Sequence, residues 1–180
     1  MNIVVYCSSF DGLPKEIRDY AVTVGTWIGR NGHTLVYGGV KAGLMHVTAE
    51  AVKAAGGRVV GVIPELFKHR ADALCDELLL TRDLNDRKSR MVALGDAYVV
   101  LPGGLGTIDE WISTLSQLTV NQTYDKPVIV CDHEGMYAAV IEQLRLTAAS
   151  VYSAGRQQPV ACYVHSPEEL NNELNKLTTK

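Results

Sequence analysis

The chain has 180 residues, of which 47% are hydrophobic and 21% are charged, and its formal net charge is −3. This balance is typical of a globular domain with a sizeable core, and it leaves no basic surplus that would indicate binding to nucleic acid or to a membrane surface. No apolar run approaches the roughly 18 residues that a membrane-spanning helix needs, and the first ten residues, MNIVVYCSSF, lack the basic region of a signal peptide.

Short β-rich runs alternate with segments of helical periodicity along the chain. The runs that predict strands are residues 3–7, 34–37, 58–63, 77–81, 97–101, 127–131 and 159–164. Most of these runs are almost wholly apolar, as expected for strands that helices cover on both faces. The alternation, without a linker or a repeat, predicts one doubly wound α/β domain over residues 1–180, with a mainly parallel sheet of about seven strands.

Four cysteines are scattered along the chain, and no two of them form a C-x-x-C pair. They are Cys7, Cys75, Cys131 and Cys162, and three of them lie in or at the end of apolar runs. This distribution favours reduced, mostly buried thiols over a disulfide framework or a zinc site. We therefore expect a cytoplasmic protein with no metal bound through these residues.

The turns beyond the carboxyl ends of the strands carry the functional signals, because ligands bind at that edge in doubly wound folds. The first turn, CSSFDG, lacks the G-x-G-x-x-G pattern of a dinucleotide site, and Ser8 either bonds a ligand or only forms the turn. In the second turn, VYGGVKAGLM, Gly38 and Gly39 can present backbone N–H groups to an anion, although tight-turn glycines explain the loop equally well. Leu44 and Met45 stand where a nucleoside triphosphatase has Lys-Ser/Thr, so Mg²⁺-dependent triphosphate hydrolysis is not expected.

The third turn lies in YVVLPGGLGTIDE, residues 98–110, where an apolar run ends in a cluster of glycines. Gly103, Gly104 and Gly106 bare several N–H donors where a helix begins, and a helix N-terminus carries roughly half a positive charge. Each glycine costs about 0.5–1 kcal/mol of extra backbone entropy, so this cluster is denser than a turn requires. We therefore predict that the turn binds a phosphate group.

Two adjacent carboxylates, Asp109 and Glu110, follow the glycine turn. Thr107 and Glu110 have the S/T-x-x-E spacing of a capping box, in which Glu110 would only return a hydrogen bond to the backbone. If the helix instead begins near Gly104, Thr107 lies inside it, and both acids lie off its apolar stripe. From spacing alone, a helix cap and an active-site carboxylate are equally good interpretations.

A basic pair, Arg87 and Lys88, interrupts the apolar face of the segment at residues 83–96, DLNDRKSRMVALGD. Cations near a helix N-terminus oppose the helix dipole. Ion pairs with Asp83 or Asp86, or long stems that reach solvent, are the structural alternatives. Because a helix that follows a parallel strand begins at the ligand-binding edge, we expect both side chains to reach the glycine turn and to form an anion site there.

Together these motifs resemble the LOG (Lonely Guy) family, whose members are often described as lysine decarboxylase-like. The resemblance extends from residue 3 to about residue 130 and rests on VYGGVKAGLM, GGRVVGVIP, the RK pair and PGGLGTIDE. It implies a Rossmann-like fold and a homodimer with sites near the subunit interface. It also implies hydrolysis of the N-glycosidic bond of a nucleoside 5′-monophosphate, either a cytokinin riboside monophosphate or AMP, to free base and ribose 5-phosphate.

The resemblance also assigns residues to the site. It implies that Glu110 and Arg87 are catalytic, and that the phosphate and ribose are bound by Lys88, Gly103, Gly104, Gly106 and Thr107. We expect the substrate site to be completed by Gly38, Gly39 and Ser8. Because positive charge develops on the ribose as the bond breaks, Glu110 is expected to stabilise that charge and to orient or deprotonate the attacking water, without a metal or redox cofactor.

Several positions depart from the family pattern. Val40 and His46 replace glycines of the family's second loop, Leu84 and Asn85 replace a Met-His pair, and the segment at 117–127 is a few residues longer. These changes leave the identity of the base and the dimer arrangement open. The alternative function is a non-catalytic carrier of a nucleotide or of molybdenum cofactor on the same fold, which would need the glycine turn but not the combination of an arginine with a carboxylate.

Overall fold

Seven parallel strands form one sheet in the computed structural model, which describes residues 1–150, 157, 159 and 161–178. The strands are β1 (Asn2–Tyr6), β2 (Thr34–Tyr37), β3 (Arg58–Pro64), β4 (Glu77–Thr81), β5 (Ala97–Val100), β6 (Val128–Cys131) and β7 (Ala161–Val164). Their order is β4-β3-β2-β1-β5-β6-β7, and each neighbouring pair is parallel. The predicted strands are confirmed to within two residues at each end, except that the run at 159–164 includes residue 160, which lies outside the described residues.

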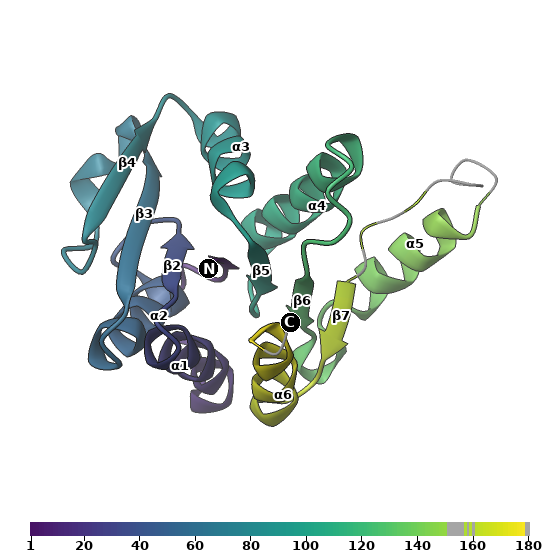
Figure 1. The fold of residues 1–180 in the computed structure, drawn as a ribbon, viewed down its shortest axis with the longest axis horizontal. Helices are drawn as coiled ribbons and strands as arrows, with labels where there is room; N and C mark the ends of the chain where they lie inside the picture. The colour runs from purple at the N-terminus through teal and green to yellow at the C-terminus, as the bar shows by residue number, and fades with distance from the viewer. Residues whose placement is uncertain (151–156, 158, 160, 179–180) are drawn as a thin grey trace.

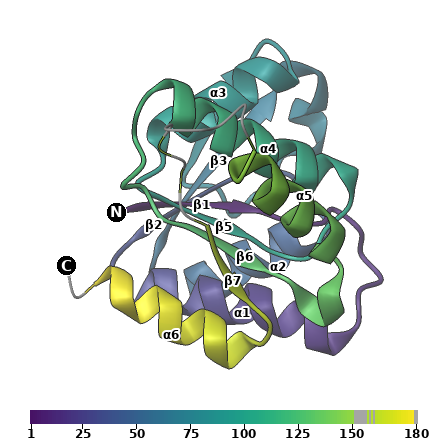
Figure 2. The same ribbon diagram turned by 90° about the vertical axis from the view of Figure 1, so that its right-hand side faces the viewer.

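Among the described residues, six α-helices cover the sheet in two layers (Figures 1 and 2). They are α1 (Lys15–Arg30), α2 (Gly43–Ala54), α3 (Leu84–Leu94), α4 (Leu105–Val120), α5 (Ala138–Ala148) and α6 (Pro167–Leu177), and two short 3-10 helices are η1 (Glu65–Arg70) and η2 (His133–Gly135). The first, second and sixth helices lie on one face, and the third, fourth and fifth lie on the other. In the part of the chain that the structure describes, no helix is long and apolar enough to cross a membrane.

The central strand β1 shows why the strands are apolar throughout rather than alternating. Ile3 and Val5 belong to the core beneath α1 and α2, whereas Val4 and Tyr6 belong to the core beneath α3 and α4. Successive side chains of a strand point to opposite faces, and both faces are covered here. The predicted doubly wound architecture is therefore confirmed.

The order in which strands are added to the sheet switches sides at β1. The strands β1 to β4 extend the sheet one way, and β5, β6 and β7 extend it the other way from β1. In open α/β sheets this switch point is where the loops diverge and ligands bind. The loops after β1 and β5 are joined there, because Leu101 N–H donates to Tyr6 O (2.8 Å) and Ser8 N–H donates to Pro102 O (3.2 Å).

Candidate active site

A cavity of about 290 Å³ lies beyond the carboxyl ends of β1, β2 and β5, at the switch point of the sheet. Residues from all three predicted turns line it, together with side chains from α3 and α4. The sequence-predicted site residues in its wall are Ser8, Gly38, Arg87, Gly104, Gly106, Thr107 and Glu110. Turns that are far apart in the sequence are thus brought together at one edge of the sheet.

The other three predicted residues, Gly39, Gly103 and Lys88, lie around the cavity rather than in its wall. Gly39 has a φ of +70° and packs against the backbone of Gly61, an approach that a side chain would block. A Cβ on Gly103 would lie 2.2 Å from Thr107 Oγ1, so this position also needs glycine. Gly39 thus packs against neighbouring backbone and Gly103 against the Thr107 side chain, and Lys88 is held by an ion pair with Asp109.

The helix α4 begins earlier than a capping box would require. Gly104 is its N-cap, and Thr107 lies inside the first turn. The capping-box interpretation of Thr107 and Glu110 is therefore wrong. Glu110 lies off the apolar stripe, as expected, but it is nevertheless buried, in a polar strip with Thr107 and Thr114 at spacings of three and four residues.

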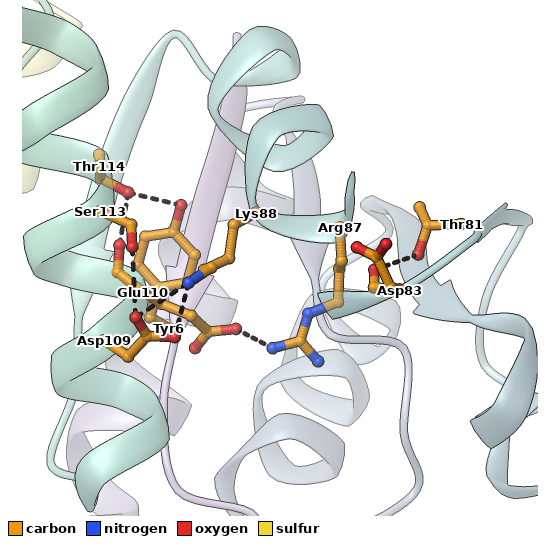
Figure 3. A network of polar contacts seen from close by, with 9 residues as sticks. All are labelled: Tyr6, Thr81, Asp83, Arg87, Lys88, Asp109, Glu110, Ser113 and Thr114. Carbon is orange, nitrogen blue, oxygen red and sulfur yellow. Dashed lines mark hydrogen bonds and ion pairs between the residues drawn. The ribbon is translucent and has the colours of Figure 1, made fainter. Parts of the chain in front are cut away.

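Arg87 on α3 forms an ion pair with Glu110 on α4 at the edge of the cavity (Figure 3). Both side chains are largely buried, with exposed fractions of 17% and 10%. Pairing of Arg87 with Asp83 or Asp86 is not observed, because the Asp83 carboxylate caps α3 by accepting from Asp86 N–H (2.8 Å) and Asp86 pairs with Arg82. Arg87 thus reaches the cavity beside the glycine turn, as expected, but its partner there is the Glu110 carboxylate rather than a free anion.

Lys88 forms a second ion pair with Asp109, parallel to the first and closer to solvent (Figure 3). Lys88 Nζ lies 2.9 and 2.8 Å from the two oxygens of the Asp109 carboxylate. The Asp109 side chain is 54% exposed, and Ser113 Oγ donates to it over 3.3 Å. Neighbouring residues on α3 thus pair with neighbouring residues on α4. Of these two ion pairs, only the inner pair, Arg87 with Glu110, lines the cavity.

The electrostatics of the inner pair favour a carboxylate that can exchange a proton. Burial raises the pKa of Glu110 above its ordinary value, and the Arg87 guanidinium opposes that rise. Arg87 pairs with Glu110 through its Nη2 atom, while its buried Nε makes no hydrogen bond to the described residues.

A buried hydroxyl pair supports α4 beside Glu110. Thr114 Oγ1 donates to the Glu110 carbonyl (2.8 Å) and lies 2.9 Å from the Tyr6 hydroxyl. Burial raises the pKa of Tyr6, so its hydroxyl stays neutral. These contacts hold the backbone of Glu110 against the end of β1, and no spacing in the sequence indicated them.

Sequence reasoning did not identify Phe10, Met45 and Cys7 as residues of the cavity wall. Phe10 is 66% exposed and lies in the first turn, which packs on the start of α2. Gly43 allows this packing, since its φ is +49° and a Cβ there would lie 2.6 Å from Ser8 O. The thiol of Cys7 is buried and its pKa is raised by that burial, so it is not a thiolate nucleophile.

Two departures from the family pattern fall outside this cavity. His46 lies on α2, where its Nδ1 is 2.7 Å from the buried carboxylate of Asp72. The segment at 117–127 ends α4 and leads into β6, so it lies at the amino edge of the sheet, opposite the cavity. Neither departure removes a side chain from the wall of the site.

Comparison with known proteins shows which family this chain resembles. A family model described as "Possible lysine decarboxylase" matches residues 45–174. A cytokinin riboside 5′-monophosphate phosphoribohydrolase from Mycobacterium tuberculosis is 35% identical over 89% of this chain and 83% of its own length. A phosphoribohydrolase of the same name from Arabidopsis thaliana is also 35% identical, over 96% of this chain and 82% of its own length.

Solved structures agree with the fold. The molybdenum cofactor carrier protein from Chlamydomonas reinhardtii superposes with a TM-score of 0.76 at 20% identity, covering 99% of this chain and 98% of that one. A molybdenum cofactor binding protein from Rippkaea orientalis has a TM-score of 0.72 at 24% identity, covering 99% and 97%. At this identity the likeness shows the Rossmann-like architecture alone. By its sequence relatives and its matching family model, the chain belongs to the LOG family.

Proposed function

We propose that this protein hydrolyses the N-glycosidic bond of a nucleoside 5′-monophosphate, releasing the free base and ribose 5-phosphate. The observation that carries the proposal is the buried Arg87–Glu110 pair, which shares one cavity with the glycine turn at the start of α4. The turn provides backbone donors for a phosphate, and the carboxylate provides the group that acts on the sugar. The names of the sequence relatives support the same reaction.

In the proposed complex the 5′-phosphate binds at Gly104, Gly106 and Thr107. Gly104 and Gly106 line the cavity at the positive end of the α4 dipole, where an anion is stabilised. Thr107 is buried and follows them in the first turn of the helix. Binding of the phosphate at this point holds the ribose in the cavity beside Glu110, so that the reacting groups meet in a fixed geometry.

Glu110 acts on the anomeric carbon of the bound ribose. As the bond to the base breaks, the base leaves with the bonding electrons and takes up a proton from solvent, and positive charge develops on the ribose. The Glu110 carboxylate stabilises this charge and accepts a proton from the water that attacks the anomeric carbon. The proton that Glu110 accepts from the attacking water is then returned to solvent. Its raised pKa brings Glu110 closer to the working pH than an exposed glutamate, and Arg87 orients it through their ion pair.

The substrate we propose is a cytokinin riboside monophosphate or AMP, acted on by a cytoplasmic homodimer. Cytoplasmic location is supported by the four cysteines, all of which are free thiols. A dimer is supported by Leu84 and Leu105, exposed apolar side chains (49% and 82%) at the starts of the two helices that hold the ion pairs. The measured mass of the purified protein in solution, by light scattering, tests the dimer.

A panel assay tests the reaction. The protein is incubated with AMP, the other common nucleoside monophosphates and isopentenyladenosine monophosphate, and free base is separated by chromatography. We expect base release from at least one adenine-containing nucleotide, in equal amount to ribose 5-phosphate, and none from the matching nucleoside without phosphate. Binding of a nucleotide without release of base from any member of the panel would contradict the proposal and favour a carrier.

A further inference from the structure

Tyr137, between η2 and α5, contacts the start of the glycine turn. The residue is buried, and its hydroxyl donates to the carbonyls of Leu101 (2.9 Å) and Gly103 (3.2 Å). These two carbonyls lie on either side of Pro102, at the point where β5 ends and the turn begins. A single hydroxyl thus holds both ends of the bend.

The contact with Gly103 fixes the direction of a donor on the other side of the turn. The structure contains no cis peptide bonds among the described residues. In a trans peptide the C=O and the following N–H point in opposite directions. When the Gly103 carbonyl is held toward Tyr137, the Gly104 N–H is directed away from it. Gly104 lines the cavity, and its N–H has no acceptor among the described residues.

Tyr137 is itself held rigidly. Its backbone N–H donates to Asp132 Oδ1 over 2.7 Å, and Asp132 is a buried carboxylate at the end of β6. The tyrosine ring packs against Trp111 on α4, with ring centroids 5.6 Å apart. The hydroxyl therefore has a fixed position relative to both the sheet and the helix that follows the turn.

We propose that Tyr137 is a positioning residue for phosphate binding, because its hydroxyl orients the Gly103–Gly104 peptide so that the Gly104 N–H points to the phosphate. The inference rests on the proposed function in one respect, the placement of the phosphate at this turn. It adds a residue from the part of the chain after residue 131, where the motifs of the family no longer guided assignment. Tyr137 acts through the backbone and does not touch the substrate.

The test compares Tyr137→Phe with a matched control, Tyr98→Phe. Tyr98 is also buried, and its hydroxyl also donates to two backbone carbonyls, those of Val92 (2.7 Å) and Gly95 (3.3 Å). Gly95 ends α3 at the edge of the sheet opposite the cavity. Both variants lose one buried hydroxyl with the same kind of partners, so any general loss of stability is shared.

Binding of AMP, inorganic phosphate and adenosine is measured by calorimetry, and thermal unfolding is measured alongside. We expect Tyr137→Phe to weaken AMP and phosphate binding on the order of tenfold, the loss typical of one impaired hydrogen bond to a charged group. Adenosine affinity stays unchanged, and in turnover assays KM for AMP rises while kcat changes little. Tyr98→Phe keeps the affinities of the unmodified protein.

Two results would overturn the inference. One is an equal loss of AMP affinity in both variants, or a loss that includes adenosine, since either would show a structural role. The other is the failure of the unmodified protein to bind AMP and phosphate. If the unmodified protein binds AMP without releasing base, and Tyr137→Phe weakens that binding selectively, the positioning role holds and the proposed reaction alone fails.

Discussion

The two ion pairs between α3 and α4 use the same kinds of side chain in different environments. Arg87 and Glu110 are both largely buried and line the cavity, whereas the outer pair of Lys88 with Asp109 joins a largely buried amine to a carboxylate that is 54% exposed. Water screens the outer pair, so its contribution to stability is expected to be small. Burial raises the pKa of Glu110, whose carboxylate lies where it can act on a sugar bound in the cavity. Position relative to the cavity thus separates the pair that we propose to be catalytic from the pair that only joins the two helices.

The largest effect is expected from Glu110→Gln, which keeps the shape of the side chain and removes its ability to accept a proton. We expect kcat to fall on the order of 10²-fold or more, within the range of general acid–base catalysis. Steady-state kinetics on AMP or the preferred nucleotide measure the loss, and circular dichroism checks that the fold is kept. Full turnover by this variant would remove Glu110 from the mechanism.

Arg87→Ala is expected to lower kcat/KM by about one to two orders of magnitude, the cost of losing a buried charged partner. It should also move the acidic limb of the pH profile. In the proposed mechanism the carboxylate is the active form of Glu110, and Arg87 lowers the pKa of Glu110. Removing the guanidinium raises that pKa further, so activity is lost at a higher pH as the solution is acidified. If Arg87→Ala lowers the melting temperature but leaves kcat/KM and the pH profile unchanged, the inner pair is structural.

Lys88→Ala is expected to raise KM by at most about fivefold, because Lys88 lies outside the cavity wall and its pair with the half-exposed Asp109 holds the helices by only about 0.2–1 kcal/mol. The measurement is made beside Arg87→Ala under identical conditions. If Lys88→Ala lowers kcat/KM as much as Arg87→Ala does, Lys88 leaves Asp109 and binds the phosphate directly, as the family motif implies.

The smallest effect is expected from Asp109→Asn. The Asp109 charge contributes to the raised pKa of Glu110. Without that charge the pKa of Glu110 falls, so the acidic limb moves to lower pH, and the shift is small because Asp109 is exposed to screening water. A pH profile of kcat/KM records the shift, and turnover at neutral pH should not change. A limb that moves upward would contradict this account of the electrostatics.

Local patterns sufficed to predict much of the site. The glycines at 103, 104 and 106 indicated exposed backbone donors, and the basic pair at 87–88 stood on a face that should have been apolar. The start of α4 at Leu105 resolved what spacing had left open, because it excludes Thr107 as the cap. The apolar periodicity of α4 did not reveal that Glu110 is buried, since a stripe of apolar residues does not show whether an acid beside it is also buried.

The sequence by itself determined the sheet, the three turns at its edge and the family, because strand burial, glycine turns and short motifs depend on residues that are close along the chain. The tertiary structure decided which acid pairs with which base, that Lys88 lies outside the cavity wall, and that Tyr137 braces the glycine turn. Those contacts join residues more than twenty positions apart. They depend on how α3 and α4 are rotated against the sheet and on where β6 ends, and no local pattern specifies these relations.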